Sequence, residues 1–447
     1  MENLITRISL SLDGKWPLEQ FVTTKNAVAG IKYGFIGLGQ GGSKIVDAFA
    51  AIKNPVTQKS IYPCMIVNSN LGDMGQLKNI PQSMQLSLEG YERGVGKDPE
   101  IGKQAFIENG ARIFEVIAKV MKDCDMIYVG GSMGGGTATG SINVLVDAIS
   151  DGLRIKTGAI ISLPRPDAVE SLNAYNATSE LVSKLTDFRE DLSGEIYRGL
   201  ENIVILDNEK IFTDHMNDPE APKLTWDFYS NYKVASIMHE WNVLTSMEGD
   251  ITLDATDLMN QILCKGGILT FAKKKINMLE INTREDLINE IVDTYKGRNV
   301  LANDFSYSKD LQSLGLVIVI PKDRKDLLNQ DALGIIRNRF NEEIPDVSVY
   351  TGLVTSSTTR QILVYTIANM SGLPARAKNL RVEAEELLRK KVEREQQASG
   401  FTMGEPLLQG TSAVSARKIT GANPFDKKDT KVAKKSVAYN PFKDSTK

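Results

Sequence analysis

Two glycine-rich segments could bring backbone amides close to a phosphate group. One contains the run Gly134-Gly-Gly-Thr-Ala-Thr-Gly140, and the other, residues 37–42, reads Gly-Leu-Gly-Gln-Gly-Gly. Each follows a short apolar run and precedes an amphipathic stretch, an order that predicts a strand, a loop and the N-terminus of a helix, starting near Ser43 and Ser141. The free amides and the dipole of a helix N-terminus favour an anion. Glycine loses the most conformational entropy on ordering, so repeated glycines are costly unless the backbone needs them. The sequence therefore predicts that another group comes close to these two backbones.

The glycine run at 134–140, the second along the chain, lacks the lysine of a Walker A loop. No Gly-Lys-Ser or Gly-Lys-Thr follows, so backbone amides and the hydroxyls of Thr137 and Thr139 would hold the phosphates. The glycine run at 37–42, the first along the chain, fits a dinucleotide fingerprint, which also needs an acidic residue about 20 positions further on. Here the second candidate strand ends in Asn68-Ser-Asn70. An NAD-dependent oxidoreductase is therefore the less favoured alternative.

Residues 134–140 resemble the glycine-rich signature of the tubulin/FtsZ superfamily, written GGGTGTG or GGGTGSG, with Ala138 in place of a glycine. Further segments between residues 31 and 257 resemble the other nucleotide loops of that superfamily in the same order. The resemblance implies GTP or GDP, with Mg²⁺ held mostly by phosphate oxygens and water. The nucleotide-binding residues that it implies are Gly39, Gln40, Gly41, Gly42, Asn68, Asn70, Gly96, Gly134, Gly135, Gly136, Thr137, Ala138, Thr139, Gly140, Pro164, Arg165, Glu170, Asn208 and Asn231.

Two acidic residues follow a long helical candidate. The segment Thr252-Leu-Asp254-Ala-Thr-Asp257 is similar to the seventh loop of the superfamily, written NxDxxD or NxDxxE, with Thr252 where an asparagine is usual. The resemblance implies that Asp254 and Asp257 orient the attacking water on a nucleotide bound by the next subunit, so that polymerisation activates a GTPase. Asp254 also precedes an apolar run and would cap a helix that starts near Ala255. The two roles can coexist.

Within the superfamily, the resemblance is greatest to the TubZ proteins. It rests on residues 88–94 and 239–246, on a long C-terminal helix and on a basic tail. It implies multi-stranded filaments, assembled head to tail, that act in the segregation or maintenance of plasmid or phage DNA. In such systems the C-terminal region contacts a DNA-binding adaptor on a centromere, so plasmid DNA would be an indirect partner.

The C-terminal tail differs in charge from the rest of the chain. Residues 401–447 hold nine Lys and Arg against four Asp and Glu, whereas the whole chain has a net charge of −3. They lack periodicity and repeat an Asn-Pro-Phe motif at 423–425 and 440–442. We expect a flexible basic tail that binds the adaptor. The alternatives are a solvated tail that keeps filaments soluble, and a non-enzymatic replication or partition factor that binds DNA directly through this segment.

Composition argues against several other classes of protein. Of 447 residues, 42% are apolar and 24% are charged, which is typical of a soluble chain with more than one domain. No apolar run approaches the ~18 residues of a membrane span, and the N-terminus lacks the order of a secretory signal, so we expect a cytoplasmic protein without a membrane partner. Three scattered cysteines and two histidines argue against a metal centre and against a Ser-His-Asp hydrolase.

Alternating apolar and amphipathic stretches must position these loops. The fold class predicted is α/β: a tubulin-like, Rossmann-type parallel sheet from strands at 33–36, 64–67, 126–129, 159–163 and 203–206, covered on both faces. A broad-faced helix at 225–247 leads to further strands at 266–271, 314–320, 347–353 and 361–367, and to helices at 284–296, 324–342 and 374–397. The predicted parts are an N-terminal extension without strands but with a helix near 18–28 (1–30), a GTP-binding domain (31–222), a connecting helix (223–249), an α+β activation domain (250–373), a C-terminal helix (374–400) and a flexible tail (401–447).

Overall fold

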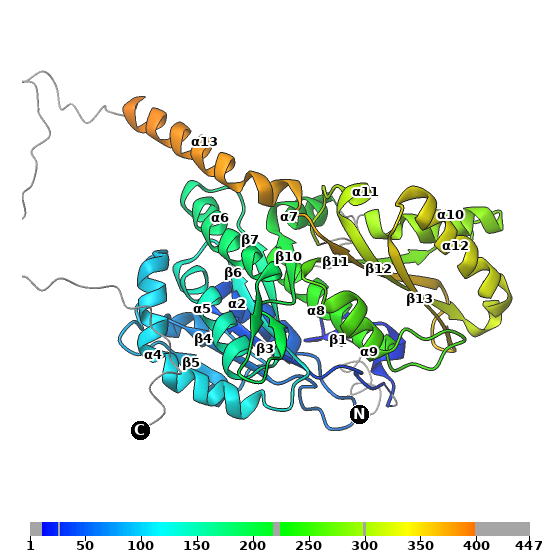
Figure 1. Ribbon diagram of the computed structural model, residues 1–447, viewed down its shortest axis with the longest axis horizontal. Coiled ribbons are helices and arrows are strands. Elements are labelled where there is room, and N and C mark those ends of the chain that lie inside the picture. The colour runs from blue at the N-terminus through cyan, green and yellow to red at the C-terminus, as the bar shows by residue number, and fades with distance from the viewer. Residues whose placement is uncertain (1–10, 26, 218–223, 298–300, 398–447) are drawn as a thin grey trace, which may run out of the picture. The chain divides into compact units, whose positions relative to one another are not determined.

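Figure 1 shows the computed structural model of the chain. The structure describes residues 11–25, 27–217, 224–297 and 301–397. Two compact units divide at Leu387, and the second is described only over 388–397, the end of a helix. The predicted basic tail, 401–447, lies outside the described residues.

One sheet of ten strands runs through the first unit. In order across the sheet, the strands are β13 (Ser348–Ser356), β12 (Leu311–Pro321), β14 (Ile362–Met370), β11 (Gly267–Ile276), β10 (Asn202–Asp207), β7 (Lys156–Leu163), β6 (Met126–Ser132), β3 (Tyr33–Leu38), β4 (Cys64–Asn68) and β5 (Gln85–Ser87). From β11 to β5 all neighbouring strands are parallel, whereas β14 is antiparallel to β11 and β12. The predicted parallel sheet is confirmed, with each strand slightly longer than its apolar run.

Helices connect these strands. They are α2 (Gly39–Ala50), α3 (Leu71–Met74), α4 (Pro99–Val120), α5 (Gly136–Gly152), α6 (Ala168–Ser183), α7 (Asn208–Asn217), α8 (Trp226–Leu244), α9 (Ala255–Leu258), α10 (Arg284–Val292), α11 (Tyr307–Asp310), α12 (Gln330–Glu343) and α13 (Ala375–Gln397). Short elements complete the described chain: the hairpins β1 (Ser11–Leu12) with β2 (Trp16–Pro17) and β8 (Phe188–Glu190) with β9 (Ile196–Arg198), the 3-10 turns η1 (Gln20–Thr23), η2 (Gln82–Met84), η3 (Lys184–Thr186), η5 (Asp293–Lys296) and η6 (Lys322–Leu327), and a π-helix, η4 (Met259–Leu263).

The parallel strands are buried on both faces. In β3, Ile36 and Leu38 belong to a core shared with α4, α5 and α6, whereas Tyr33 and Phe35 belong to a second core shared with α2 and α8. This division follows from the two-residue period of a strand. Since neither face meets solvent, the strand candidates are continuous apolar runs instead of alternating patterns.

The connecting helix was predicted correctly in place but not in environment. α8 begins and ends within the predicted range 225–247, yet it is buried on almost every side instead of on one broad face. Even the charged and polar side chains of Lys233, His239 and Glu240 are at most 9% exposed. A helix buried all round lies inside the protein, here in the second core, which it shares with α2 and with strands of the C-terminal half.

The N-terminal extension departs from its prediction. The sequence indicated no strand and a helix near 18–28, whereas β1 and β2 form a short hairpin and only the 3-10 turn η1 follows. Leu12, Phe21 and Val22 are buried in the second core. The Trp16 ring lies 5.3 Å from that of Tyr229 in α8. Contacts with residues more than 200 positions away stabilise this segment, so no local pattern announces it.

The C-terminal half continues the same sheet. Its four predicted strands correspond to β11, β12, β13 and β14, and α13 matches the predicted C-terminal helix. The helix predicted at 324–342 is a 3-10 turn followed by α12, and that at 284–296 is α10 followed by a 3-10 turn. Since one sheet passes through both halves, the division into separate domains stays a prediction. In the described part of the chain no helix has the length and apolar character needed to cross a membrane.

Candidate functional site

Two long helices begin without a side-chain cap at the same edge of the sheet. α2 follows β3, α5 follows β6, and these two strands are neighbours. No side chain accepts a hydrogen bond from the first amides of either helix, whereas the carboxylates of Asp98 and Asp167 cap α4 and α6. Amides left free at a helix N-terminus are donors for an anion. The geometry therefore favours a phosphate group at the starts of α2 and α5.

The glycine-rich signature lies largely inside a helix and not in a loop. α5 starts at Gly136, earlier than the predicted start near Ser141. The predicted close approach is real, but another helix makes it: a Cβ atom on Gly140 would lie 2.2 Å from the carbonyl oxygen of Pro99 in α4. Gly135, the residue before the helix, has open space around it. Glycine here serves helix packing as well as access to the amides.

The first glycine run packs against the second. α2 starts at Gly39, again earlier than the predicted Ser43, and Gly39 has a positive φ of 64°. A Cβ atom on Gly39 would lie 3.3 Å from the Cβ atom of Thr137, and one on Gly42 would lie 2.2 Å from the carbonyl oxygen of Gly130. The structure thus brings both predicted runs to one place.

The departure from the superfamily signature is accommodated by missing side chains. Ala138 is 3% exposed and packs in the first core. Its methyl carbon would lie only 3.2 Å and 3.8 Å from Cβ atoms on Gly131 and Gly39. Because both neighbours are glycines, the methyl group fits without moving the backbone.

The two threonine hydroxyls of the signature do not have equal roles. The Thr137 hydroxyl lies 2.9 Å from that of Ser69, which follows β4. The Thr139 hydroxyl donates to the carbonyl oxygens of Gly135 and Gly136 in its own helix. In this arrangement the Thr139 proton is directed to its own helix, because α5 starts early enough to accept it. A role of this hydroxyl in holding a phosphate stays a prediction.

The segment after β4 holds an unsatisfied polar group. The Asn68 side chain is 2% exposed, and its Nδ2 atom has no hydrogen-bond partner. Asn70 caps α3 by accepting from the amide of Gly72 at 2.8 Å. A buried amide without a partner costs free energy unless a ligand or water satisfies it. Asn68 and Asn70 therefore flank the same edge, one with a free donor and one as a helix cap.

The Gly96 loop is tied to the start of α6. Gly96 and Lys97 both have a positive φ, and the Lys97 ammonium lies 2.5 Å from the Glu170 carboxylate. This carboxylate raises the pKa of Lys97. Asn173, one turn further along α6, donates to the carbonyl oxygens of Lys97 at 3.0 Å and of Gly134 at 3.3 Å. Residues 94–102, which resemble the third nucleotide loop of the superfamily, are thus held to α6 and to the signature.

The segments after β7 and β10 lie side by side. Arg165 pairs with Glu209 at 2.8 Å, next to Asn208, and its guanidinium lies 3.8 Å from the centre of the Phe212 ring. Pro164 is buried just before it. These contacts bring together the predicted residues of both segments.

Asn231 lies buried in the second turn of α8. Asp227, one turn before it, pairs with Lys44 of α2 at 3.3 Å. The start of α8 is therefore beside α2, the helix that begins in the first glycine run. A contact of Asn231 with the nucleotide stays a prediction.

Asp254 and Asp257 lie away from all of these residues. Asp254 caps α9 by accepting from the Asp257 amide at 2.8 Å, which confirms the predicted cap, and both side chains are exposed. The part of α8 that follows Asn231, about 20 Å long by its helical rise, separates them from that residue. A Cβ atom on Gly30, just before β3, would lie 3.1 Å from the Cβ atom of Ala255 in α9. The acids are thus at the amino end of β3 and the glycine runs at its carboxyl end.

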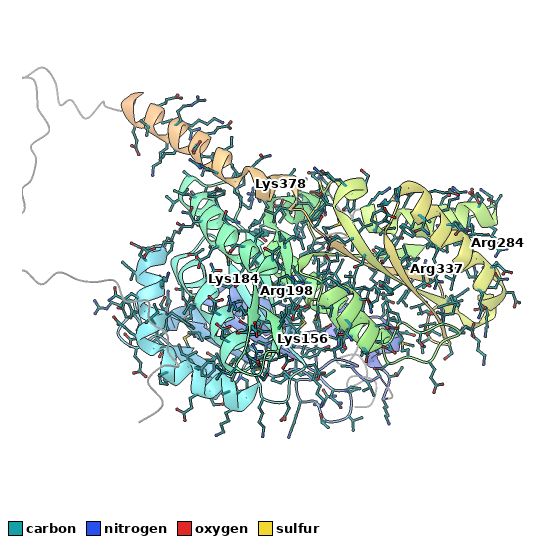
Figure 2. The ribbon with its side chains drawn as sticks, in the orientation of Figure 1. Lys156, Lys184, Arg198, Arg284, Arg337 and Lys378 are labelled. Carbon is teal, nitrogen blue, oxygen red and sulfur yellow. The ribbon has the colours of Figure 1, made fainter. Side chains whose placement is uncertain are left out.

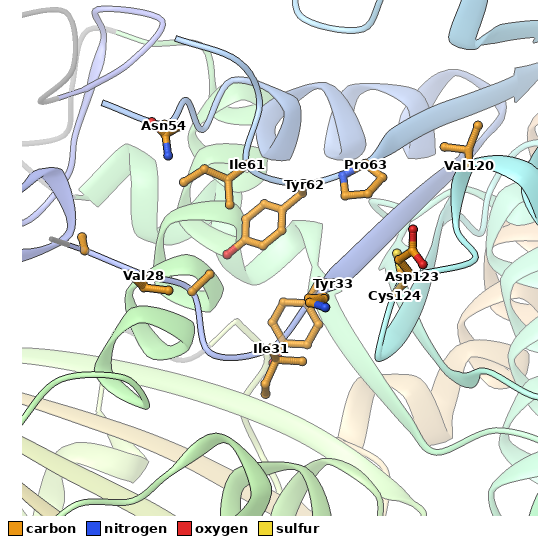
Figure 3. A pocket seen from close by; sticks show the side chains of 13 residues that line it. Val28, Ile31, Tyr33, Asn54, Ile61, Tyr62, Pro63, Val120, Asp123 and Cys124 are labelled. Atoms are coloured by element: carbon orange, nitrogen blue, oxygen red, sulfur yellow. The ribbon is translucent and has the colours of Figure 1, made fainter. Parts of the chain in front are cut away.

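A hollow in the described part of the chain also lies at the amino ends of the strands. It measures about 440 Å³ and is lined by Ile31, Tyr33, Tyr62, Pro63 and Cys124 among others (Figure 3). These residues precede or begin β3, β4 and β6. The hollow is therefore distinct from the carboxyl ends of β3 and β6, where the two glycine runs lie. We call that end of the sheet the glycine-rich edge.

Sequence reasoning missed four residues of the glycine-rich edge: Ser69, Lys97, Asn173 and Arg376. Lys97 lies in the segment that resembles the third loop, so its nearness was open to inference. Nothing in the sequence joins Arg376, in α13, to a loop some 170–210 positions earlier.

Two family models match the chain. The tubulin/FtsZ family GTPase domain matches residues 32–188, and the C-terminal domain of the tubulin/FtsZ-like protein TubZ matches residues 240–381. A tubulin-like protein TubZ from Bacillus cereus is 30% identical over 265 residues, which cover 58% of each chain. A tubulin-like protein CetZ from Pyrococcus furiosus is 25% identical over 263 residues, or 57% of this chain and 64% of that one.

Solved structures show the same fold. A protofilament of TubZ from Bacillus thuringiensis serovar israelensis in a GTPγS form has a TM-score of 0.71 at 21% identity, and covers 85% of this chain and 98% of that one. A helical model of a four-stranded TubZ filament has a TM-score of 0.72 at 22% identity, covering 84% and 95%.

The fold and the two uncapped helices at one edge of the sheet define a tubulin-like protein. The chain belongs to the tubulin/FtsZ superfamily, and its C-terminal half is of the TubZ-like kind. This membership argues against the NAD-dependent oxidoreductase and the non-enzymatic DNA-binding factor.

Proposed function

We propose that the protein binds GTP at the glycine-rich edge and hydrolyses it after assembling head to tail into filaments. One observation carries this proposal: the uncapped starts of α2 and α5 lie at one end of β3, and the acids Asp254 and Asp257 lie at the other. A single chain cannot bring them together. A second copy, stacked in the same orientation, would place its acids over the nucleotide of the first.

The chain's own groups suit phosphoryl transfer, which depends on positioning and on stabilising charge. The amides at the starts of α2 and α5 would hold the phosphates, and Asn68 would offer its free amide group. Asp254 and Asp257 would orient the attacking water. Mg²⁺, when bound, neutralises phosphate charge; no cluster of His, Cys, Asp and Glu within the described ranges could hold it alone, so phosphate oxygens and water would complete its shell.

The first test is the dependence of hydrolysis on protein concentration. Phosphate release per molecule should rise steeply above a critical concentration, together with light scattering in GTP and in a non-hydrolysable analogue. A rate per molecule that stays constant from high dilution to high concentration would contradict a shared site.

Variants separate assembly from hydrolysis. Asp257→Ala should still polymerise but form long-lived, GTP-bound filaments. Asp254→Asn keeps an N-cap acceptor, so it should fold normally and report only the loss of the carboxylate. Glu248→Gln, an exposed acid in the preceding loop, is the control. Normal turnover in both aspartate variants would refute their assignment.

We further propose that the filaments move or maintain plasmid or phage DNA. The TubZ-like membership supports this role, and the net positive charge of residues 401–447 suits a complex of a DNA-binding adaptor with DNA. The tail would be the adaptor's binding site.

A further inference from the structure

Arg376 reaches from the first turn of α13 to two loops of the glycine-rich edge. One terminal nitrogen, Nη1, lies 2.5 Å from the Asp207 carboxylate, and the other, Nη2, donates to the carbonyl oxygen of Pro164 at 2.5 Å. The side chain is 17% exposed and the Asp207 side chain 6%. Lys378, which is two residues after Arg376 and is labelled in Figure 2, shows where α13 begins. The planar guanidinium thus joins the end of β10 to the end of β7.

A second contact extends the link to α6. Glu383, two turns along α13, accepts from Arg376 at 3.2 Å and from the hydroxyl of Ser171 at 2.7 Å. Ser171 is fully buried and follows Glu170, which pairs with Lys97 of the third loop. Arg376 and Glu383 therefore act as one clamp on three separate segments.

Each partner of the clamp is a predicted nucleotide-binding residue or its neighbour. Pro164 belongs to the predicted set, Asp207 precedes Asn208, and Ser171 follows Glu170. Asp207 also accepts from the amide of Glu209 at 3.1 Å, so the same carboxylate fixes the first turn of α7. Removing the guanidinium would leave a buried carboxylate and a buried carbonyl oxygen without their partner, and the loops would be free to move.

We propose that Arg376 is a positioning residue that holds the 164, 170 and 208 segments in their binding geometry, and so couples helix α13 to nucleotide affinity. This inference rests on the proposed function. Coupling between two sites is reciprocal. A nucleotide bound at the glycine-rich edge therefore stabilises the start of α13, and anything that disturbs the start of α13 lowers the affinity for the nucleotide. Ordering of the C-terminal helix and occupancy of the site would then change together.

The test compares two arginine variants in the full chain. Arg376→Gln should weaken binding of a fluorescent GTP analogue by about tenfold, the effect of about 1.4 kcal/mol. KM should rise in step, while kcat in fully assembled filaments stays near that of the unmodified chain, because the acids come from another subunit. Arg376→Lys keeps the charge but not the two-pronged contact, so its affinity should fall between the two. Arg381→Gln removes an exposed arginine of the same helix, which pairs with Glu385 at 2.9 Å, and should leave affinity unchanged.

Three outcomes are decisive. No GTP binding by the unmodified chain overturns the proposed function. Binding by the unmodified chain with equal affinity in Arg376→Gln overturns the inference alone. If Arg376→Gln does not fold, Arg376→Lys decides: it keeps a positive charge beside Asp207 but loses the two-pronged contact to Asp207 and Pro164, and an affinity equal to that of the unmodified chain overturns the inference.

Discussion

The glycines of the signature are required by backbone contacts between helices. Around Gly140 the backbone of α4 is so close that a methyl group would meet the Pro99 carbonyl oxygen at 2.2 Å and the Lys103 amide at 2.5 Å. Gly110, in the same α4, has open space at its Cβ position. Two glycines in neighbouring helices thus have opposite tolerance for alanine.

Replacing each by alanine tests this difference. Gly140→Ala should lower the free energy of unfolding by about 1–3 kcal/mol, because backbone atoms must move apart. Gly110→Ala should raise it by about 0.5–1 kcal/mol, since alanine favours the helix. Urea titrations measure both. A Gly140→Ala protein as stable as the unmodified chain would show that the contact is not tight.

His239 lies in a chain of three buried side chains. Asn242 donates to the Tyr62 hydroxyl at 3.2 Å, and this hydroxyl lies 2.8 Å from Nδ1 of His239, within hydrogen-bond distance. Burial lowers the pKa of His239 to about 4.

This pKa predicts acid sensitivity. The pKa of His239 in the folded state lies below the unfolded value of 6.5. The contribution of this histidine to the free energy of unfolding is therefore complete above pH about 6.5 and is lost as the pH falls towards 4. The loss amounts to roughly 3 kcal/mol at 1.36 kcal/mol per pKa unit. Unfolding titrations between pH 7 and 4.5 should show a shallower slope for His239→Gln than for the unmodified chain. Equal slopes would place the protonation elsewhere.

At this scale the sequence predicted the glycine runs, the segments around Asn68, Pro164 and Asn231, and the cap at Asp254. It could not predict the direction of the Thr139 hydroxyl, which depends on where α5 begins. It could not predict Arg376 either, because side-chain contacts between distant segments leave no periodic pattern.

Among the elements, the N-terminal segment is held by charge as well as by packing. The Glu19 carboxylate pairs with Lys273 at 2.7 Å and with Lys275 at 2.8 Å, both in β11. Lys273 also pairs with Glu240 of α8, which is 1% exposed and accepts from the Tyr365 hydroxyl at 3.0 Å. Burial alone would lower the pKa of Lys273, yet the two carboxylates raise it overall. The N-terminal segment, α8, β11 and β14 meet at this network.

Two lysines of one strand give a matched test of the network. Lys273→Met leaves the Glu240 carboxylate buried with a lost partner and should cost about 3–5 kcal/mol. The Lys275 side chain is 54% exposed, so Lys275→Met should cost less than about 1 kcal/mol. Thermal unfolding of both variants measures the difference. Similar losses would mean that solvent screens both pairs alike.

Element positions followed well from the sequence where apolar runs were long, as in β3, β6 and α8. The N-terminal hairpin did not, because its four paired residues depend on α8 for burial. The early starts of α2 and α5 were missed because glycine is usually unfavourable in helices, whereas here the neighbouring backbone requires it.

On the scale of the whole molecule, exposed apolar side chains occur at both edges of the parallel sheet. Ile101, Val169 and Leu172 lie near the starts of α4 and α6, at the glycine-rich edge. Phe188 and Ile196, of the β8–β9 hairpin, follow the far end of α6. Such surfaces at two opposite ends suit a head-to-tail contact, which does not close on itself.

The basic tail should be separable from assembly. Deleting 401–447 should leave GTP turnover and filaments intact, because none of the predicted nucleotide-binding residues and neither of the predicted catalytic acids, Asp254 and Asp257, lies there. It should abolish recruitment of the adaptor bound to its DNA, measured by co-sedimentation with filaments. As a control, a chain with neutral residues in place of its tail lysines would show how much of the recruitment depends on charge. Unchanged recruitment after deletion would refute the role of the tail.

The two halves of the ten-stranded sheet are joined by a short seam. Only three residue pairs link β10 to β11, whereas six link β10 to β7 and nine link β11 to β14. In hydrogen–deuterium exchange, the seam amides at 267–269 should therefore lose protection before those of the central strands on either side. In the filament that we propose, a pulling force between the two halves of the sheet would open this seam before the longer pairings beside it, because fewer residue pairs hold it.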